Sequence, residues 1–144
     1  MKKLFLILIL GFIYTTRSYA QDKTPTSVLT SFQNSFINAE NTAWSIVKDL
    51  YRVDFTLEDE KASAFFNSDG NFIASSRQVT SLQLPMFLKS SLKSSFHNYD
   101  IINLFEVDNE NGVTYYAIIK NSKKQLMLES ISGEWVTFNK YANF

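Results

Sequence analysis

The sequence predicts an α+β fold in which a helix followed by four strands occurs twice, forming one mainly antiparallel sheet with two helices on one face. Two short segments have the apolar spacing of a helix, and each is followed by alternating segments separated by hairpin-type turns. Phe36 and Phe96, at the two helix ends, lie 60 residues apart, and the turn residues Gly70 and Gly133 lie 63 apart. A shared offset of this kind indicates a tandem repeat. Neither half could bury its strands alone, so we expect one continuous sheet.

The first 20 residues are expected to be a signal peptide that is cleaved on export. Lys2 and Lys3 precede the apolar run 4–14, and Ser18-Tyr19-Ala20 provides a small-x-small cleavage site. The run is short for a membrane span, and the chain has no Cys that could carry a lipid. We therefore expect a periplasmic or secreted protein without membrane insertion after cleavage.

The remaining residues, 21–144, are long enough for one domain with its own core. We expect a single domain made of two repeats, at about 24–80 and 83–140. Removal of Lys2, Lys3 and Arg17 leaves 11 basic residues against 14 acidic ones, a net charge of about −3, which argues against nucleic-acid binding. The absence of Cys excludes disulfides, thiol nucleophiles and cysteine metal sites.

The first repeat opens with Thr24 and Pro25, because proline suits the first position of a helix. The apolar stripe that follows is Val28, Leu29, Phe32 and Phe36. A short strand is expected around Trp44 and Ile46, and Tyr51 to Leu57 alternates strictly between apolar and polar residues. Further strands are predicted at Ala62 to Phe66 and Phe72 to Val79, with turns at 58–61 and 67–70.

The second repeat has the same order of elements. Its helix runs from Pro85 to Phe96, with the stripe Leu84, Phe87, Leu88, Leu92 and Phe96. The strands are predicted at Tyr99 to Val107, Val113 to Lys120, Gln125 to Ile131 and Glu134 to Asn139. Since Phe36 and Phe96 close the two stripes, both are expected to bury against the sheet.

Several segments taken in order resemble a known family. These are Ser35-Phe36, Asn41-Thr42-Ala43-Trp44, Tyr51-x-Val53-x-Phe55, Phe66-Asn67-x-Asp69-Gly70 and Leu84-Pro85 with its helix. Together they are similar to the PepSY-like, beta-lactamase-inhibitor-like domains of exported Bacteroidetes proteins. The resemblance implies tandem helix-plus-four-strand repeats with the second sheet face open. In the second repeat Ser132-Gly133 replaces the Asp-Gly turn, and no Trp opens the first strand.

Candidates for chemistry are few. His97 follows a helix end, where a cation interacts well with the helix dipole, so a capping role is favoured over catalysis. The acidic run 58–60 could attract a cation but is interpreted as a solvated hairpin turn, because Ca²⁺ needs six or more oxygens from a shaped loop. The segments 67–70 and 108–112 resemble fragments of calcium loops, but both lack the closing bidentate Glu and are also interpreted as turns. No nucleophile elbow, phosphate loop or zinc-protease motif is present. We expect no enzyme activity, cofactor or bound metal.

The open sheet face is the predicted binding surface. In the strand 113–120, alternation directs Val113, Tyr115, Ala117 and Ile119 toward the helices, and Thr114, Tyr116, Ile118 and Lys120 outward. In the last strand Val136 and Phe138 would point inward. The predicted partner-binding residues are therefore Tyr116, Ile118, Trp135 and Thr137. The alternative is that Trp135 packs structurally over a strand or a helix edge.

These observations predict an exported binding or inhibitor-like module whose partner is an unidentified protein or peptide, with no indication of oligomeric state. One alternative is a structural envelope component without a discrete ligand. Another is a small hydrolase, which would need Asp54 beside a second acid in a cleft.

Overall fold

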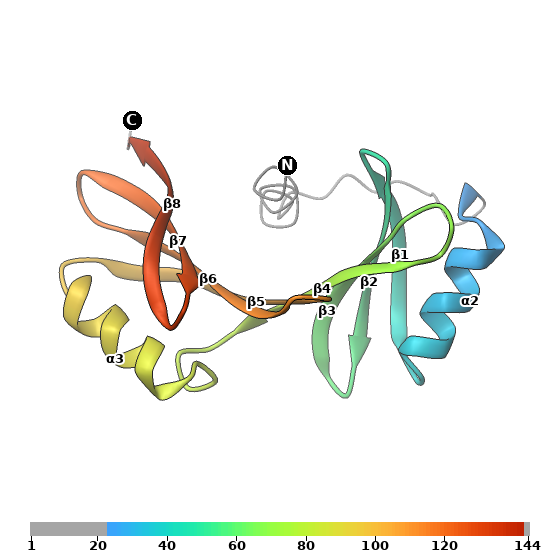
Figure 1. Cartoon of the computed structure of the whole chain (residues 1–144), viewed down its shortest axis with the longest axis horizontal. Helices are drawn as coiled ribbons and strands as arrows, with labels where there is room; N and C mark the ends of the chain where they lie inside the picture. The colour runs from blue at the N-terminus through green and yellow to red at the C-terminus, as the bar shows by residue number, and fades with distance from the viewer. Residues whose placement is uncertain (1–22, 143–144) are drawn as a thin grey trace. The chain divides into compact units, whose positions relative to one another are not determined.

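The computed structural model describes residues 23–142, which form two helices and eight strands (Figure 1). These residues divide into two compact units, with the boundary between Ser76 and Arg77. The first unit contains α2 (Thr26–Ser35), β1 (Glu40–Val47), β2 (Leu50–Leu57), β3 (Glu60–Phe66) and most of β4 (Phe72–Val79). The second unit contains the end of β4, α3 (Met86–Ser95), β5 (Asp100–Asn109), β6 (Gly112–Lys120), β7 (Lys124–Ile131) and β8 (Glu134–Ala142). The predicted α+β order of a helix and four strands, repeated once, is confirmed. The predicted signal peptide lies outside the described residues.

The eight strands are hydrogen-bonded in chain order, from β1 to β8. Tight turns fix the register of the hairpins. Glu58 and Asp59 join β2 to β3 with φ of 49° and 66°, and Ser132 and Gly133 join β7 to β8 with φ of 52° and 83°. Two-residue loops with both φ values positive match the twist of antiparallel strands. These segments therefore act as turns, as the sequence predicts.

The core of the first unit lies between α2 and the strands and is largely aromatic. Val28 and Phe32 are the buried residues of α2. The ring of Phe32 lies 5.2–6.4 Å from the rings of Phe36, Trp44, Phe55 and Phe66. Val53 and Ala64 complete the buried cluster. Phe36, predicted to be buried against the sheet, is only half-buried. It follows the last helical residue, so it packs at the edge of the cluster.

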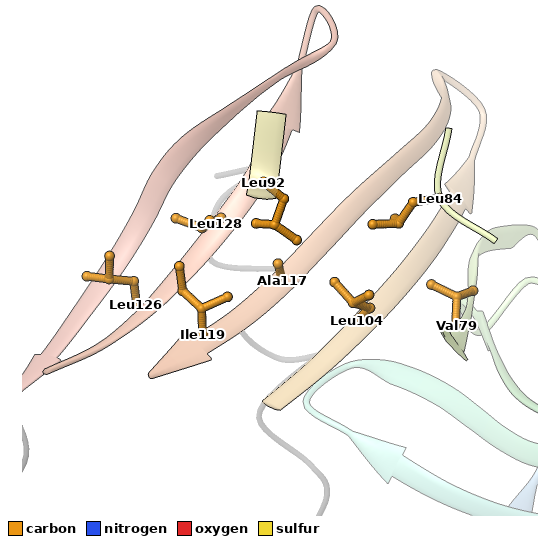
Figure 2. Close-up of a cluster of buried hydrophobic side chains, with 8 residues drawn as sticks. All are labelled: Val79, Leu84, Leu92, Leu104, Ala117, Ile119, Leu126 and Leu128. Carbon is orange, nitrogen blue, oxygen red and sulfur yellow. The ribbon is translucent and has the colours of Figure 1, made fainter. Parts of the chain in front are cut away.

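The core of the second unit is largely aliphatic (Figure 2). Leu88 and Leu92 are the buried residues of α3, and Figure 2 shows Leu92 reaching from the helix toward Leu128 and Ala117. The buried cluster consists of Val79, Leu84, Leu92, Leu104, Ala117, Ile119, Leu126 and Leu128. Phe96 is half-buried rather than buried, like its counterpart Phe36. Phe87, predicted to lie in the stripe, is 64% exposed, since it sits at the flank of the first helical turn beside Gly133.

Candidate functional site

Two of the predicted site residues, Tyr116 and Ile118, point away from α3, as alternation along β6 requires. Their neighbours Ala117 and Ile119 belong to the cluster beneath α3, and Tyr115 packs against it. Successive side chains of a strand point to opposite faces. Tyr116 and Ile118 therefore lie on the face of β5–β8 opposite α3, which we call the far face.

The orientation predicted for Trp135 and Thr137 is wrong. The indole Nε1 of Trp135 donates a hydrogen bond of 2.8 Å to the carbonyl oxygen of Leu88, inside α3, and the ring packs against the aliphatic cluster. Thr137 pairs with Leu128, a member of the same cluster. Both residues thus share the face that α3 covers. The four predicted residues do not form one patch, and the structure supports the structural role for Trp135.

The turn before β8 explains the difference, and a bulge follows Thr137. Because Ser132 and Gly133 form a two-residue loop, Ile131 pairs with Glu134 and Ser130 pairs with Trp135. Residues paired across two strands share a face, and Ser130 lies two residues from Leu128 on the same face of β7. Trp135 therefore lies on the face that α3 covers. The register then shifts between Met127 and Leu128, leaving Phe138 as the extra residue of a bulge. The two-residue turn could have been inferred from Ser-Gly in the sequence, whereas the bulge has no sequence signal that we recognise.

Other residues take the place of Trp135 and Thr137 on the far face. The strand register aligns Phe105, Tyr116, Glu129 and Val136 in one row across β5, β6, β7 and β8. The ring of Phe138 lies 6.3 Å from that of Tyr116 in an edge-to-face arrangement, which places Phe138 beside this row. Ile118 and Met127 form the next pair along β6 and β7. The far face therefore carries a band of aromatic and aliphatic side chains.

Exposure divides this band into two groups. Tyr116, Ile118 and Met127 are buried, with 2%, 9% and 6% of their surface exposed. Val136 is 45% exposed, and Ile131, which shares its face with Glu129 along β7, is 48% exposed. The buried residues hold the sheet together and are poor candidates for direct contact. The exposed residues are available to a partner.

Tyr116 is fixed by a polar contact within the band. Its hydroxyl donates a hydrogen bond of 2.7 Å to Glu129 Oε1, on the directly opposite residue of β7. Burial, followed by the hydrogen bond and negative charge of Glu129, raises the pKa of Tyr116 far above its ordinary value of 10.0. The phenol therefore remains protonated at neutral pH and serves as a donor to the carboxylate.

The residues considered for chemistry have ordinary structural surroundings. His97 is exposed, and its Nδ1 lies 3.3 Å from the carbonyl oxygen of Ser94 at the end of α3, in agreement with the predicted position at a helix end. Asp54 lies beside Arg52, at 2.7 Å, and accepts a hydrogen bond from Ser63. Among residues 23–142, no group of three or more His, Cys, Asp or Glu side chains is arranged to hold a metal ion. In the same range, no helix combines the length and apolar character needed to cross a bilayer.

Solved structures from Bacteroides have a similar fold. A candidate periplasmic protein from Bacteroides eggerthii superposes with a TM-score of 0.74 at 16% identity, covering 83% of this chain and 88% of its own. A DUF2874 family protein from Bacteroides uniformis superposes with a TM-score of 0.73 at 11% identity, covering 82% of this chain and 88% of its own. A BLIP-like protein from Bacteroides fragilis superposes with a TM-score of 0.69 at 14% identity, covering 92% of this chain and 90% of its own. The chain shares the fold of these proteins.

The fold match is not accompanied by recognisable sequence similarity. No family model matches the chain. No curated protein matches it by sequence either. At 11–16% identity the solved structures establish the arrangement of helices and strands and nothing finer.

Proposed function

We propose that this chain is an exported, non-enzymatic binding module of the PepSY-like kind, which recognises a protein or peptide through the far face of β5–β8. The lysine-flanked apolar run at the start of the sequence supports export. The periplasmic assignment of the Bacteroides eggerthii protein and the BLIP-like name of the Bacteroides fragilis protein are in line with export and with an inhibitor-like binding role.

The exposed aliphatic residues on the far face carry this proposal. Val136 and Ile131 expose 45% and 48% of their surface beside the half-buried rings of Phe105 and Phe138. A sheet holds such side chains in fixed positions, so little conformational entropy is lost when a partner covers them. Apolar surface with adjacent aromatic rings is typical of the centre of a protein interface.

The charge of the far face indicates the kind of partner. Glu129 lies in the same row as Val136, and Glu134 shares the face of Ile131, its partner across the β7–β8 hairpin. Lys120 is on this face at the end of β6, where it lies opposite Asp100 of β5, so the carboxylates of the far face outnumber this lysine. Carboxylates beside an apolar band favour a partner surface with Lys or Arg around an apolar centre. A partner with an acidic surface would be repelled by the carboxylates of the far face.

Two valines provide a matched test. Val136 is on the far face, whereas Val113 is 52% exposed on the side of β6 that carries Tyr115 and Ala117, toward α3. The exported chain is immobilised, and proteins retained from the periplasmic fraction are compared by quantitative mass spectrometry. A partner should be retained by the unmodified chain and by Val113→Lys but lost by Val136→Lys.

Two outcomes would contradict the proposal. Equal loss in both variants would place binding elsewhere or reflect general charge repulsion. Retention of no specific protein by the unmodified chain would favour a structural envelope component without a discrete ligand. Thermal unfolding of each variant checks that the folded structure is intact.

A further inference from the structure

The start of α3 carries apolar side chains that no core requirement explains. Leu82, Met86 and Phe87 expose 82%, 87% and 64% of their surface. They lie within six residues of one another, around Pro85, while the neighbouring Leu84 and Leu88 are buried beneath the helix. The buried leucines hold α3 on the sheet, so the three exposed side chains are free for another role.

The corresponding position of the first unit shows that the fold does not need these residues. At the offset of 60 residues, Met86 and Phe87 correspond to Thr26 and Ser27, which are exposed polar residues at the start of α2. The helix α2 is otherwise similar to α3 in length and in its two buried positions. The exposed apolar side chains at positions 86 and 87 are therefore specific to the second unit.

Positive charge accompanies the apolar tip. Lys89 and Lys93 lie three and seven residues after Met86, which places them on the same side of the helix. Both are exposed, and α3 contains no acidic residue from Met86 to Ser95. Beyond the other end of α3, Lys124 Nζ lies 6.0 Å from the ring centroid of Tyr99. The helix α2, in contrast, has no charged residue between Thr26 and Ser35.

We propose that the start of α3 is a peripheral contact site for an anionic phospholipid surface. Leu82, Met86 and Phe87 enter the boundary between headgroups and acyl chains, and Lys89 and Lys93 pair with lipid phosphates. Apolar side chains backed by lysines are the combination that binds such interfaces. Without its first 20 residues the chain has a net charge of about −3. An anionic membrane therefore attracts the cationic surface of α3 and repels the rest of the chain, which orients α3 toward the lipid.

The position of the lysines favours a lipid surface over a protein. Lys89 and Lys93 lie exposed along the same side of α3 as Met86, so one flat anionic surface can meet the apolar side chains and both charges at once. Side chains that protrude from a helix start can enter a lipid interface without a complementary pocket. The site is distinct from the far face, so this proposal stands independently of the proposed function.

Vesicle binding tests the proposal. The exported chain is mixed with vesicles of phosphatidylglycerol and phosphatidylethanolamine, or of phosphatidylcholine alone, and the bound fraction is measured by sedimentation. We expect binding to the anionic vesicles that weakens as salt is raised. The double variant Leu82→Ser, Met86→Ser should weaken it by at least about tenfold. The double variant Lys89→Gln, Lys93→Gln should weaken it by roughly 25-fold, or about fivefold for each lysine.

The first unit supplies the matched control. Ile37 is 71% exposed immediately after α2, and Ile37→Ser should leave vesicle binding unchanged. Equal binding by Ile37→Ser and by the Leu82, Met86 variant would overturn the proposal, as would equal binding to both vesicle types. Absence of binding to either vesicle type would also overturn the proposal. If the Leu82, Met86 variant then failed to retain a periplasmic protein that the unmodified chain retains, the tip would be assigned to a protein partner.

Discussion

The two units use the same plan of a helix on four strands, but they fill the space beneath the helix with different side chains. In the first unit, Phe32 lies among four other aromatic rings. In the second, Leu92 lies among leucines, an isoleucine and an alanine. Each unit also contains a Trp on its helix side, Trp44 from β1 and Trp135 from β8. The plan therefore depends on the spacing of apolar residues and not on their identity.

The faces away from the helices differ more strongly. Opposite α2, Arg52 contacts Asp54, and its guanidinium lies 5.8 Å from the ring centroid of Phe65. Opposite α3, the far face is a band of apolar and aromatic side chains with Val136 exposed. The helix-side clusters maintain the fold, whereas the opposite faces are free to specialise. This contrast is the reason for placing a binding role on the second unit.

The largest expected effect is on the aromatic cluster. Phe32→Ala removes a ring that contacts Phe36, Trp44, Phe55 and Phe66, and it should lower the free energy of unfolding by about 3 to 5 kcal/mol. Leu92→Ala should cost about 2 to 5 kcal/mol. Urea unfolding measures both.

The half-buried helix-end residues sharpen this comparison. Phe36→Ala and Phe96→Ala each remove a side chain that is only partly covered, so each should cost roughly half as much as Phe32→Ala. A loss at Phe36 as large as that at Phe32 would show that α2 needs its terminal ring as much as its central one.

A second comparison concerns the hairpin turns next to the two helix starts. A Cβ at Gly70 would lie 2.7 Å from the Ser27 carbonyl oxygen, and Gly70 has φ of +87°. A Cβ at Gly133 would lie 3.6 Å from the Phe87 ring, an ordinary contact. Gly70→Ala should therefore cost about 2 to 5 kcal/mol, combining overlap with backbone strain, and Gly133→Ala about 1 to 2 kcal/mol from strain alone.

Gly112 is the control for strain, because its φ is +102° and no atom lies within 4 Å of its added Cβ. Gly112→Ala should match Gly133→Ala in urea unfolding. If Gly70→Ala costs no more than Gly112→Ala, the first turn does not depend on close contact with α2.

The order of elements and the helix-side residues could be predicted from the sequence, because each depends on local apolar spacing. Val28, Phe32, Leu88 and Leu92 are buried as their helical period requires. The far face could be predicted only in part. Tyr116 and Ile118 lie on a regular strand, so alternation places them correctly. The alternation predicted for β8 began on the wrong face, because its starting parity depends on the two-residue turn; the Phe138 bulge changes the register only of the residues that follow it.

The two tryptophans test how each helix is attached to its strands. Trp135→Phe keeps a ring but removes the hydrogen bond to the Leu88 carbonyl, so it should cost about 1 to 3 kcal/mol. Trp44→Phe keeps an aromatic contact with Phe32 in the first cluster and should cost less. Urea unfolding compares the two variants, and vesicle and partner binding of Trp135→Phe should be unchanged. Equal costs would mean that the indole hydrogen bond adds nothing to the attachment of α3.

A small effect at neutral pH is expected on the far face, at Tyr116. Tyr116→Phe removes the hydrogen bond to Glu129 and should cost about 1 to 2 kcal/mol at pH 7. The folded state holds the phenol proton more tightly than the unfolded state, whose ordinary pKa is 10.0. The stability from this difference is fully present below pH 10 and decreases as pH rises above it, by about 1.4 kcal/mol per unit. Between pH 8 and 12, the free energy of unfolding measured in urea should thus fall less steeply for Tyr116→Phe than for the unmodified chain. The difference in stability between the two proteins should therefore become smaller as the pH rises. Parallel declines would show that the Tyr116 phenol is not held protonated on the far face. The hydrogen bond between Tyr116 and the half-buried Glu129 would then not be the contact that fixes this row of side chains.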